Sequence, residues 1–252
     1  MFMKIALITG GNRGIGRAIA LSTAAKGHDI LLTYKSHKEE AEEVTALIEE
    51  RGRKAVALPL DVSDTKSFTT FRETVKQTLR DIWKRETFDF LVNNGGIGFY
   101  LSFTQTTEAH FDQLANVNFK GVFFLIQTLL PLIADGGRII NVSSLTARTF
   151  VPNHTAYAPL KAAVEVLTRY LAVELGPRGI TVNVVAPGPT ATDYGEGLVR
   201  DNAAVNQQLA AQTPLGRVGQ PEDIGALVAV LLSEETYWVN GQRIEATGGI
   251  NL

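Results

Sequence analysis

Short apolar runs alternate along this chain with longer segments in which apolar residues recur at helical spacing. The runs are rich in aliphatic and β-branched residues, as expected for strands that are buried on both faces. Such strands, separated by helices, predict a parallel sheet covered by helices on both sides. We therefore expect an α/β fold with a doubly wound sheet of about seven strands. The expected strands are residues 4–9, 29–34, 54–60, 88–94, 137–144, 181–187 and 242–246.

The segments between these runs predict the covering helices. In the first half of the chain they end near residues 26, 51 and 85, and the later helices cover about 108–134, 153–176 and a stretch from residue 221. Residues 188–217 show no strong pattern, yet they are too many for a simple connection. We interpret this segment as a mobile substrate lid within one domain that spans residues 1–252.

Composition narrows the classes of partner. The formal net charge is −2 with acids and bases interspersed, so we expect no nucleic-acid partner. Cysteine is absent and the four histidines are scattered, so we expect no metal site. The apolar segment from Gly121 is interrupted by Gln127 and Pro131 and is shorter than the roughly 20 residues that span a membrane. With no secretory signal at the N-terminus, we expect a cytoplasmic protein without a membrane partner.

A glycine-rich turn, TGGNRGIG, connects the first expected strand to the first helix, from Thr9 to Gly16. In parallel sheets ligands bind beyond the carboxyl ends of the strands. Glycines at this point let backbone N–H groups approach a pyrophosphate, which the positive end of the helix also favours. The spacing differs from G-x-G-x-x-G, and a glycine-rich turn is also compatible with a tight strand-to-helix connection.

The end of the second expected strand bears on the choice between NAD and NADP. An NAD site places an acid here for the ribose hydroxyl, whereas an NADP site needs positive charge for the 2′-phosphate. The chain has Tyr34, Lys35 and Ser36, with no acid before Glu39, and Arg13 of the glycine turn can reach the same phosphate. We therefore expect NADP(H) in preference to NAD(H), although both cations could instead face water.

Two further strand ends and one helix carry candidate chemistry. LVNNGG ends at Gly96, NVSS ends at Ser144, and the helix that follows places Tyr157 and Lys161 four residues apart on one face. Taken singly, the serine is equally compatible with a turn or cap, and the tyrosine and lysine with a packed helix.

Together these motifs resemble the short-chain dehydrogenase/reductase family across essentially the whole chain. The glycine turn is similar to TGxxxGxG, LVNNGG to LVNNAG, YAPLK to YxxxK, and PGPTATD to the family's PG turn. The resemblance implies a Rossmann-like fold and a set of four catalytic residues: Asn118, Ser144, Tyr157 and Lys161. It also implies that the cofactor is bound by Gly10, Asn12, Arg13, Gly14, Ile15, Gly16, Tyr34, Lys35, Ser36, Asp61, Val62, Asn94, Gly95, Gly96, Tyr157, Lys161, Pro187, Gly188, Thr190 and Thr192.

The sequence departs from the family pattern at two positions. Gly95 replaces the usual alanine of NNAG, which leaves Asn93 and Asn94 available to tie neighbouring strands together. Pro159 lies within YxxxK, where we expect it in the first turn of the helix if that helix begins near Thr155.

By this resemblance, Tyr157 protonates a carbonyl oxygen as hydride arrives from the nicotinamide, or removes the hydroxyl proton in the reverse reaction. Ser144 binds the same oxygen, and Lys161 lies beside Tyr157 and beneath the ribose, where its ammonium favours the phenolate. Asn118 holds a water that connects Lys161 to solvent. For Asn118 a purely structural role in helix packing also remains open.

The expected pocket is rich in aromatic residues, which favours an apolar or aryl carbonyl substrate. Arg148 could meet a substrate carboxylate or simply face water. The residues expected around the pocket are Ile97, Phe99, Tyr100, Arg148, Phe150, His154 and the lid residue Tyr194.

The predicted function is that of an NADPH-dependent carbonyl reductase. Alternatives are a 3-oxoacyl carrier-protein reductase, an NAD-linked alcohol or sugar dehydrogenase, and a non-catalytic NADP-sensing regulator. An acidic carrier protein would need basic docking residues; Arg169 and Arg178 are candidates, but Asp135 weakens that interpretation. Helices 108–134 and 153–176 have more apolar surface than one sheet face covers, which predicts a dimer and, by resemblance to the family, a tetramer.

Overall fold

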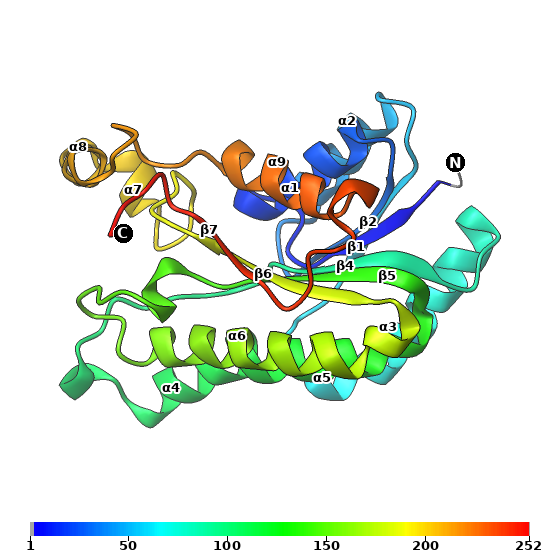
Figure 1. Ribbon diagram of the computed structural model, residues 1–252, viewed down its shortest axis with the longest axis horizontal. Coiled ribbons are helices and arrows are strands. Elements are labelled where there is room, and N and C mark those ends of the chain that lie inside the picture. Colours follow the sequence, from blue (N-terminus) through cyan, green and yellow to red (C-terminus); the bar gives the residue numbers. More distant parts are fainter. Residues whose placement is uncertain (1–2, 252) are drawn as a thin grey trace.

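A computed structural model of the chain describes residues 3–251. Its centre is a seven-stranded sheet in the order β3-β2-β1-β4-β5-β6-β7, and every neighbouring pair is parallel (Figure 1). The predicted doubly wound α/β fold is confirmed. The strands are β1 (Ile5–Ile8), β2 (Asp29–Tyr34), β3 (Ala55–Pro59), β4 (Phe88–Asn93), β5 (Ile133–Val142), β6 (Thr181–Pro187) and β7 (Arg243–Ala246).

Helices cover both faces of the sheet. In Figure 1, α1, α2 and α9 lie on one face, and α3, α4, α5 and α6 lie on the other. The helices are α1 (Gly14–Ala25), α2 (Lys38–Glu49), α3 (Phe68–Thr78), α4 (Glu108–Ala115), α5 (Gly121–Leu129), α6 (Tyr157–Glu174), α7 (Leu198–Asp201), α8 (Ala203–Gln212) and α9 (Pro221–Leu231). No helix within the described residues is both long and apolar enough to cross a bilayer.

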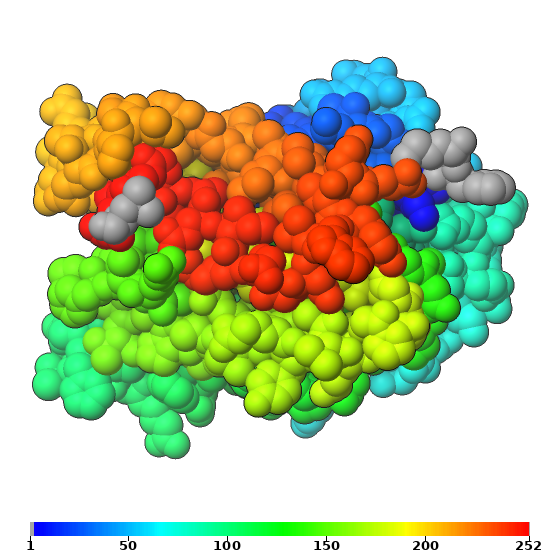
Figure 2. All heavy atoms as spheres, in the orientation of Figure 1, coloured from blue at the N-terminus to red at the C-terminus, as the bar shows by residue number. Residues whose placement is uncertain are grey.

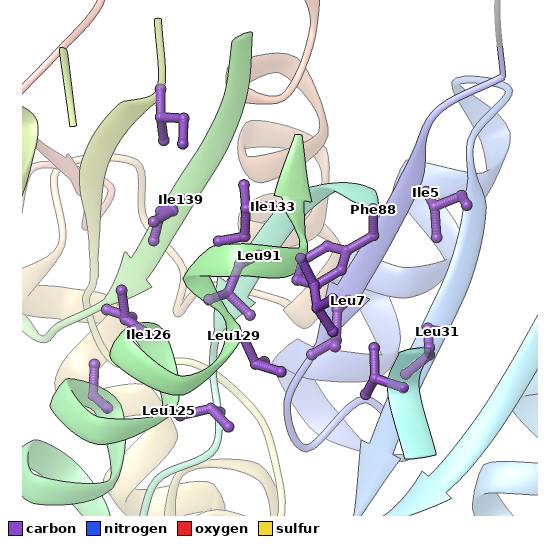
Figure 3. Close-up of a cluster of buried hydrophobic side chains, with 14 of the residues drawn as sticks. Ile5, Leu7, Leu31, Phe88, Leu91, Leu125, Ile126, Leu129, Ile133 and Ile139 are labelled. Atoms are coloured by element: carbon purple, nitrogen blue, oxygen red, sulfur yellow. The ribbon is translucent and has the colours of Figure 1, made fainter. Parts of the chain in front are cut away.

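The two largest apolar clusters lie on opposite faces of the sheet, one beneath each helical layer. Figure 3 shows the cluster on the α5 side, where Leu125 and Leu129 of that helix pack with Leu91 of β4 and Leu7 of β1. Residues of β1, β4 and β6 are buried throughout, which explains why their sequences lack polar alternation. Because these strands are buried and closely packed, the residues that follow them are held in fixed positions.

The segment 188–217 is more regular than expected, because it contains α7 and α8. Asn202 begins α8 by accepting hydrogen bonds from the N–H groups of Ala204 and Val205, both at 3.1 Å. A short polar helix of this kind has almost no apolar periodicity, and the sequence pattern therefore missed it.

The helix expected over 108–134 is interrupted and ends early. A wider π-helical turn, residues 116–120, separates α4 from α5, and the chain becomes strand β5 at Ile133. Ile133 pairs with Phe88 and Arg138 with Phe90, so four residues of β5 stand against one residue of β4 and the strand bulges by three residues. The expected strand began only after this bulge.

The helix expected over 153–176 is shorter at both ends, because α6 begins at Tyr157 and ends at Glu174. Pro159 is its third residue and lies in the first turn, where no intrahelical N–H bond is needed. The preceding turn is closed by the N–H of Ala158, which donates to the His154 carbonyl at 2.8 Å. Tyr157 and Lys161 therefore share one face of an unbroken helix.

Candidate active site

A cavity of about 860 Å³ lies beyond the carboxyl ends of the strands, where β1 and β4 meet and the order of strands reverses. Residues 188–217, the predicted lid, form one wall through the loop after β6 and through α8. Ser144, Tyr157, Lys161 and every residue predicted to bind the cofactor except Tyr34 line this cavity. In Figure 2 the C-terminal segment crosses the face between the helical layers.

The glycine turn has the shape that an anion requires. Gly10 and Gly14 have φ of 61° and 52°, and a Cβ atom at Gly16 would lie 1.9 Å from the Gly10 carbonyl oxygen. Among the described residues, no side chain caps α1 and no acid lies in its first turn. The first N–H groups of α1 thus face the cavity without a competing carboxylate on their own turn, as a pyrophosphate site requires.

Asn93 and Asn94 tie the strands together, as the sequence predicted. Asn93 Nδ2 donates to Asn141 Oδ1 at 2.8 Å, which links β4 to β5. Asn94 Nδ2 donates to the carbonyls of Thr9 and Gly10 at 3.0 and 3.2 Å. These bonds hold the glycine turn against β4.

The two cations predicted to select NADP are each paired with a carboxylate. Lys35 Nζ lies 2.7 Å from Asp61 Oδ2, and Arg13 Nη1 lies 2.8 Å from Asp193 Oδ2. Burial opposes ionisation of Asp61, but hydrogen bonds from Lys35 and Ser63 outweigh it and lower the pKa of Asp61. Asp193 was missed, because its sequence position gave no sign that it would face the glycine turn.

Two residues predicted to bind the cofactor, Tyr34 and Asn12, make contacts with other parts of the protein. Tyr34 is the one predicted cofactor residue that does not line the cavity, and it packs instead against the core cluster on the α1 side. Asn12 lines the cavity, but its Nδ2 donates to the Ser36 carbonyl at 3.4 Å and to Glu40 Oε2 at 3.1 Å. Asn12 therefore connects the glycine turn to the loop after β2.

Ser144, Tyr157 and Lys161 meet at one end of the cavity. Ser144 follows β5, and its Oγ accepts from the N–H of Thr146 at 3.2 Å. Lys161 Nζ lies 5.6 Å from the centroid of the Tyr157 ring and donates to the Val142 carbonyl at 2.9 Å.

The electrostatics at this end of the cavity are governed by burial. Burial raises the pKa of Tyr157 to about 12, although the hydroxyls of Tyr194 and Ser144 act in the opposite direction. Burial also lowers the pKa of Lys161 to about 8. In this structure desolvation of the phenol therefore outweighs the stabilisation of phenolate that the sequence led us to expect.

Asn118 does not line the cavity. It is fully buried in the π-helical turn, where Nδ2 donates to the carbonyls of Ile97 and Leu114 and Oδ1 accepts from the N–H of Ile97 at 3.3 Å. A Cβ atom added at Gly96 would lie 3.1 Å from Asn118 Oδ1 and 3.5 Å from Lys161 Nζ. Asn118 Oδ1 and Lys161 Nζ thus both lie on the side of Gly96 where a side chain would project, and the predicted water of Asn118 remains a prediction.

A network of charged side chains holds Ser143 and Ser144 at this end of the cavity. Ser143 Oγ donates to Glu165 Oε1 at 2.6 Å, and Arg243 Nε donates to the same oxygen at 2.8 Å. Arg243 Nη2 also donates to the Ser144 carbonyl at 3.2 Å. The sequence analysis missed Glu165 and Arg243, since only the pairing of β6 with β7 brings Arg243 near Ser144.

The expected aromatic wall is present in part. Ile97, Tyr100, Phe150, His154 and Tyr194 line the cavity, whereas Phe99 packs beside His110 with ring centroids 5.5 Å apart.

Arg148 is not among the residues that line the cavity, and it pairs with Glu245 at 3.3 Å. This pairing favours the alternative that Arg148 faces water, and its contact with a substrate carboxylate stays a hypothesis. Within residues 3–251, no three histidine, aspartate or glutamate side chains gather as metal ligands would.

Comparison with known proteins gives relatives over the whole length of the chain. A family model described as enoyl-(acyl carrier protein) reductase matches residues 10–251. The chain is 38% identical to a tetrahydroxynaphthalene reductase of Pestalotiopsis fici, over 98% of this chain and 91% of the relative.

Solved structures of similar proteins match the chain over almost its whole length. The reductase LugOII, which catalyses a keto-reduction at C1 during lugdunomycin biosynthesis, is 35% identical with a TM-score of 0.93, covering 99% of this chain and 98% of that one. The angucycline C-6 ketoreductase LanV, solved with bound NADP, is 36% identical with a TM-score of 0.92, covering 98% and 95%. With these matches, and with its motifs gathered around one cavity, the chain belongs to the short-chain dehydrogenase/reductase family of oxidoreductases.

Proposed function

We propose that this protein is an NADPH-dependent ketoreductase that reduces an aryl ketone to an alcohol. The observation that carries the proposal is that one continuous cavity is lined both by the cations Arg13 and Lys35 and by Ser144, Tyr157 and Lys161. The glycine turn and the two cations would hold a dinucleotide in this cavity, and the hydroxyl groups line the same cavity. The similarity to a tetrahydroxynaphthalene reductase, to the keto-reducing LugOII and to the angucycline C-6 ketoreductase LanV supports the same substrate class.

The residues of the cavity fit a nicotinamide dinucleotide. The turn from Gly10 to Gly16 is tight, because a Cβ atom at Gly16 would collide with the Gly10 carbonyl oxygen, and Arg13 and Lys35 supply positive charge for a 2′-phosphate in the same cavity. When bound, NADPH supplies the hydride. Pro187, Gly188, Thr190 and Thr192 would hold the nicotinamide end, and the Asn94–Gly96 turn would lie beneath it.

The chain's own residues manage the oxygen and its proton. Because the pKa of Tyr157 is raised to about 12, the phenol is protonated near neutral pH and acts as an acid toward a carbonyl oxygen. Ser144 donates a second hydrogen bond to that oxygen and stabilises the developing alkoxide. Lys161 returns a proton toward Tyr157 after each turnover, with Asn118 as the proposed holder of the connecting water.

The aromatic wall favours a flat substrate. Tyr100 and His154 lie edge to face with ring centroids 5.2 Å apart, and His154 meets Tyr157 in the same way at 5.9 Å. Phe150 is 88% exposed although it lines the cavity, so its ring is free to cover a substrate at the entrance. Such rings bind aryl groups by stacking and edge contacts.

Initial rates of cofactor oxidation test the proposal. Wild type and Tyr157→Phe are each assayed with NADPH and with NADH. The substrates are aryl ketones, β-keto esters and an acetoacetyl thioester. We expect turnover of aryl ketones with NADPH, and a loss of at least about 100-fold in Tyr157→Phe with unchanged NADPH binding. Comparable rates in that variant would refute the role of Tyr157.

The same panel separates the alternatives. Preference for the thioester would favour the carrier-protein reductase, preference for NADH the NAD-linked dehydrogenase, and binding of NADPH without any turnover the sensing regulator. Arg178, a candidate docking residue for an acidic carrier protein, is already paired with Asp135 at 2.7 Å. This pairing favours the ketoreductase hypothesis over the carrier-protein reductase. The cytoplasmic location stays a prediction.

We also propose assembly into a homotetramer through the α4–α5 and α6 faces. Phe123 and Phe124 of α5 are about two-fifths exposed, and Tyr170 and Val173 of α6 are 66% and 78% exposed. An apolar strip of this kind on neighbouring helices is typical of a surface that another subunit covers.

A further inference from the structure

Tyr194 of the lid approaches Tyr157 inside the cavity. Their ring centroids are 6.4 Å apart, with the planes inclined at 53°. Tyr157 begins α6, whereas Tyr194 lies in the loop between β6 and α7, so only the folded lid brings the two phenols together.

Gly98 fixes where the Tyr194 hydroxyl lies. A Cβ atom at Gly98 would be 2.1 Å from that hydroxyl oxygen, so the phenol occupies space that any other side chain at position 98 would fill. A reciprocal contact joins the same two segments, because a Cβ atom at Gly195 would be 2.5 Å from the Tyr100 hydroxyl oxygen. Each tyrosine thus packs on a glycine of the opposite segment, which restrains Tyr194 beside Tyr157.

Nearby charges give the Tyr157 phenolate little stabilisation, so hydrogen bonds donated to its oxygen become important. Lys161 directs its Nζ to the Val142 carbonyl, and burial lowers the pKa of its ammonium to about 8. Burial raises the pKa of Tyr194, so that its hydroxyl stays neutral and keeps its proton for donation. The interaction between the two phenols lowers the pKa of Tyr157.

We propose that Tyr194 is a positioning residue, whose hydroxyl donates a hydrogen bond to the Tyr157 oxygen and stabilises its phenolate. The inference rests on the proposed function. In the reduction, hydride from NADPH adds to the carbonyl carbon, the C=O π pair moves to oxygen, and that oxygen takes the Tyr157 proton. The electron pair left on the Tyr157 oxygen then accepts a hydrogen bond from the Tyr194 hydroxyl. The O–H bond of Tyr194 stays intact.

The other titratable groups around Tyr157 can be told apart from it. His154 meets its ring edge to face, Tyr100 packs on His154, and Lys161 lies one helical turn away. Burial raises the pKa of Tyr100. A tyrosinate transition that disappears in Tyr157→Phe therefore reports on Tyr157.

The test compares Tyr194→Phe with the matched control Tyr100→Phe in the NADP⁺ complex, whose cationic nicotinamide favours phenolate. Tyr194→Phe keeps the ring against Gly98 and removes only the donor. Ultraviolet absorbance of tyrosinate is followed against pH, beside the pH profile of alcohol oxidation. We expect the Tyr157 transition to move up by about one to two pH units in Tyr194→Phe. It should not move up in Tyr100→Phe, because Tyr100 contributes to the raised pKa of Tyr157 and its removal acts in the opposite direction.

An unmoved transition in Tyr194→Phe, or an equal movement in Tyr100→Phe, would overturn the inference. Gly98→Ala provides a second variant, because its Cβ displaces the Tyr194 hydroxyl, and it should give the same upward movement with native circular dichroism. The absorbance titration needs no substrate. Absence of turnover in wild type would therefore refute the proposed function, while the transition in Tyr194→Phe would still decide the role of Tyr194.

Discussion

Arg13 and Asp193 form an ion pair of 2.8 Å that joins the glycine turn to the lid across the cavity. Arg13 is the residue before α1, and Asp193 lies in the loop after β6. A carboxylate on Arg13 competes with any phosphate that binds the same guanidinium. The lid contact and the proposed recognition of NADP therefore use one side chain.

Asp193→Asn should free Arg13 for the 2′-phosphate and remove a repulsive charge. Both partners are partly exposed, so the gain is modest, about 2- to 5-fold in KM for NADPH. The KM for NADH should not change, because NADH has no 2′-phosphate. Initial rates with both cofactors measure this, with Arg13→Ala as the opposite control. Equal changes for the two cofactors would contradict the competition.

Lys161 should make the stability of the free protein depend on pH. Burial lowers the pKa of Lys161 from 10.5 to about 8, so between these values the unfolded chain binds the proton that the folded chain has lost. The penalty for the buried ammonium is complete below pH 8 and is relieved as the pH rises to 10.5. Relative to Lys161→Met, the free energy of unfolding of wild type should rise by about 3 kcal/mol across that range.

Urea unfolding of wild type and Lys161→Met at several pH values in this window provides the measurement. Other groups titrate equally in both proteins, so their contributions cancel in the difference. Curves that run parallel across the window would show that Lys161 is not desolvated as described.

Thr168 should matter for stability although it lies outside the cavity. It is buried on α6, accepts from Asn141 Nδ2 at 2.8 Å and donates to the Val164 carbonyl at 2.9 Å. Thr168→Val keeps the shape but leaves the Asn141 donor without its partner, which should cost about 1–3 kcal/mol in urea unfolding. Thr69→Val, at an exposed position of α3, is the control and should be nearly neutral. Equal effects at both sites would contradict this role of Thr168.

Val173 should contribute to the proposed assembly, because it is 78% exposed on α6 beside Tyr170. A carboxylate in the centre of an apolar interface is left desolvated and unpaired, so Val173→Asp should shift sedimentation toward smaller species. Thr70→Asp, which adds the same charge at an exposed position of α3, should keep the wild-type profile. A wild type that sediments as a monomer would refute the assembly.

The sequence by itself determined the order of strands and helices and most residues around the cavity. Continuous apolar runs such as the one ending at Val92 need cover on both faces, so a parallel doubly wound sheet followed from the chain alone. The same topology places strand ends together, which is why Gly10, Asn94, Ser144 and Pro187 could be assigned to one cavity before its geometry was known.

Only the tertiary structure decided which side chains pair across that cavity. Asp193 on Arg13, Asp61 on Lys35 and Tyr194 on Gly98 join segments far apart in sequence, and no local periodicity encodes such contacts. Burial is likewise a property of the whole fold, so the raised pKa of Tyr157 and the lowered pKa of Lys161 could not be derived from their four-residue spacing. Spacing places two groups on one helix face, and desolvation by the surrounding elements sets their protonation.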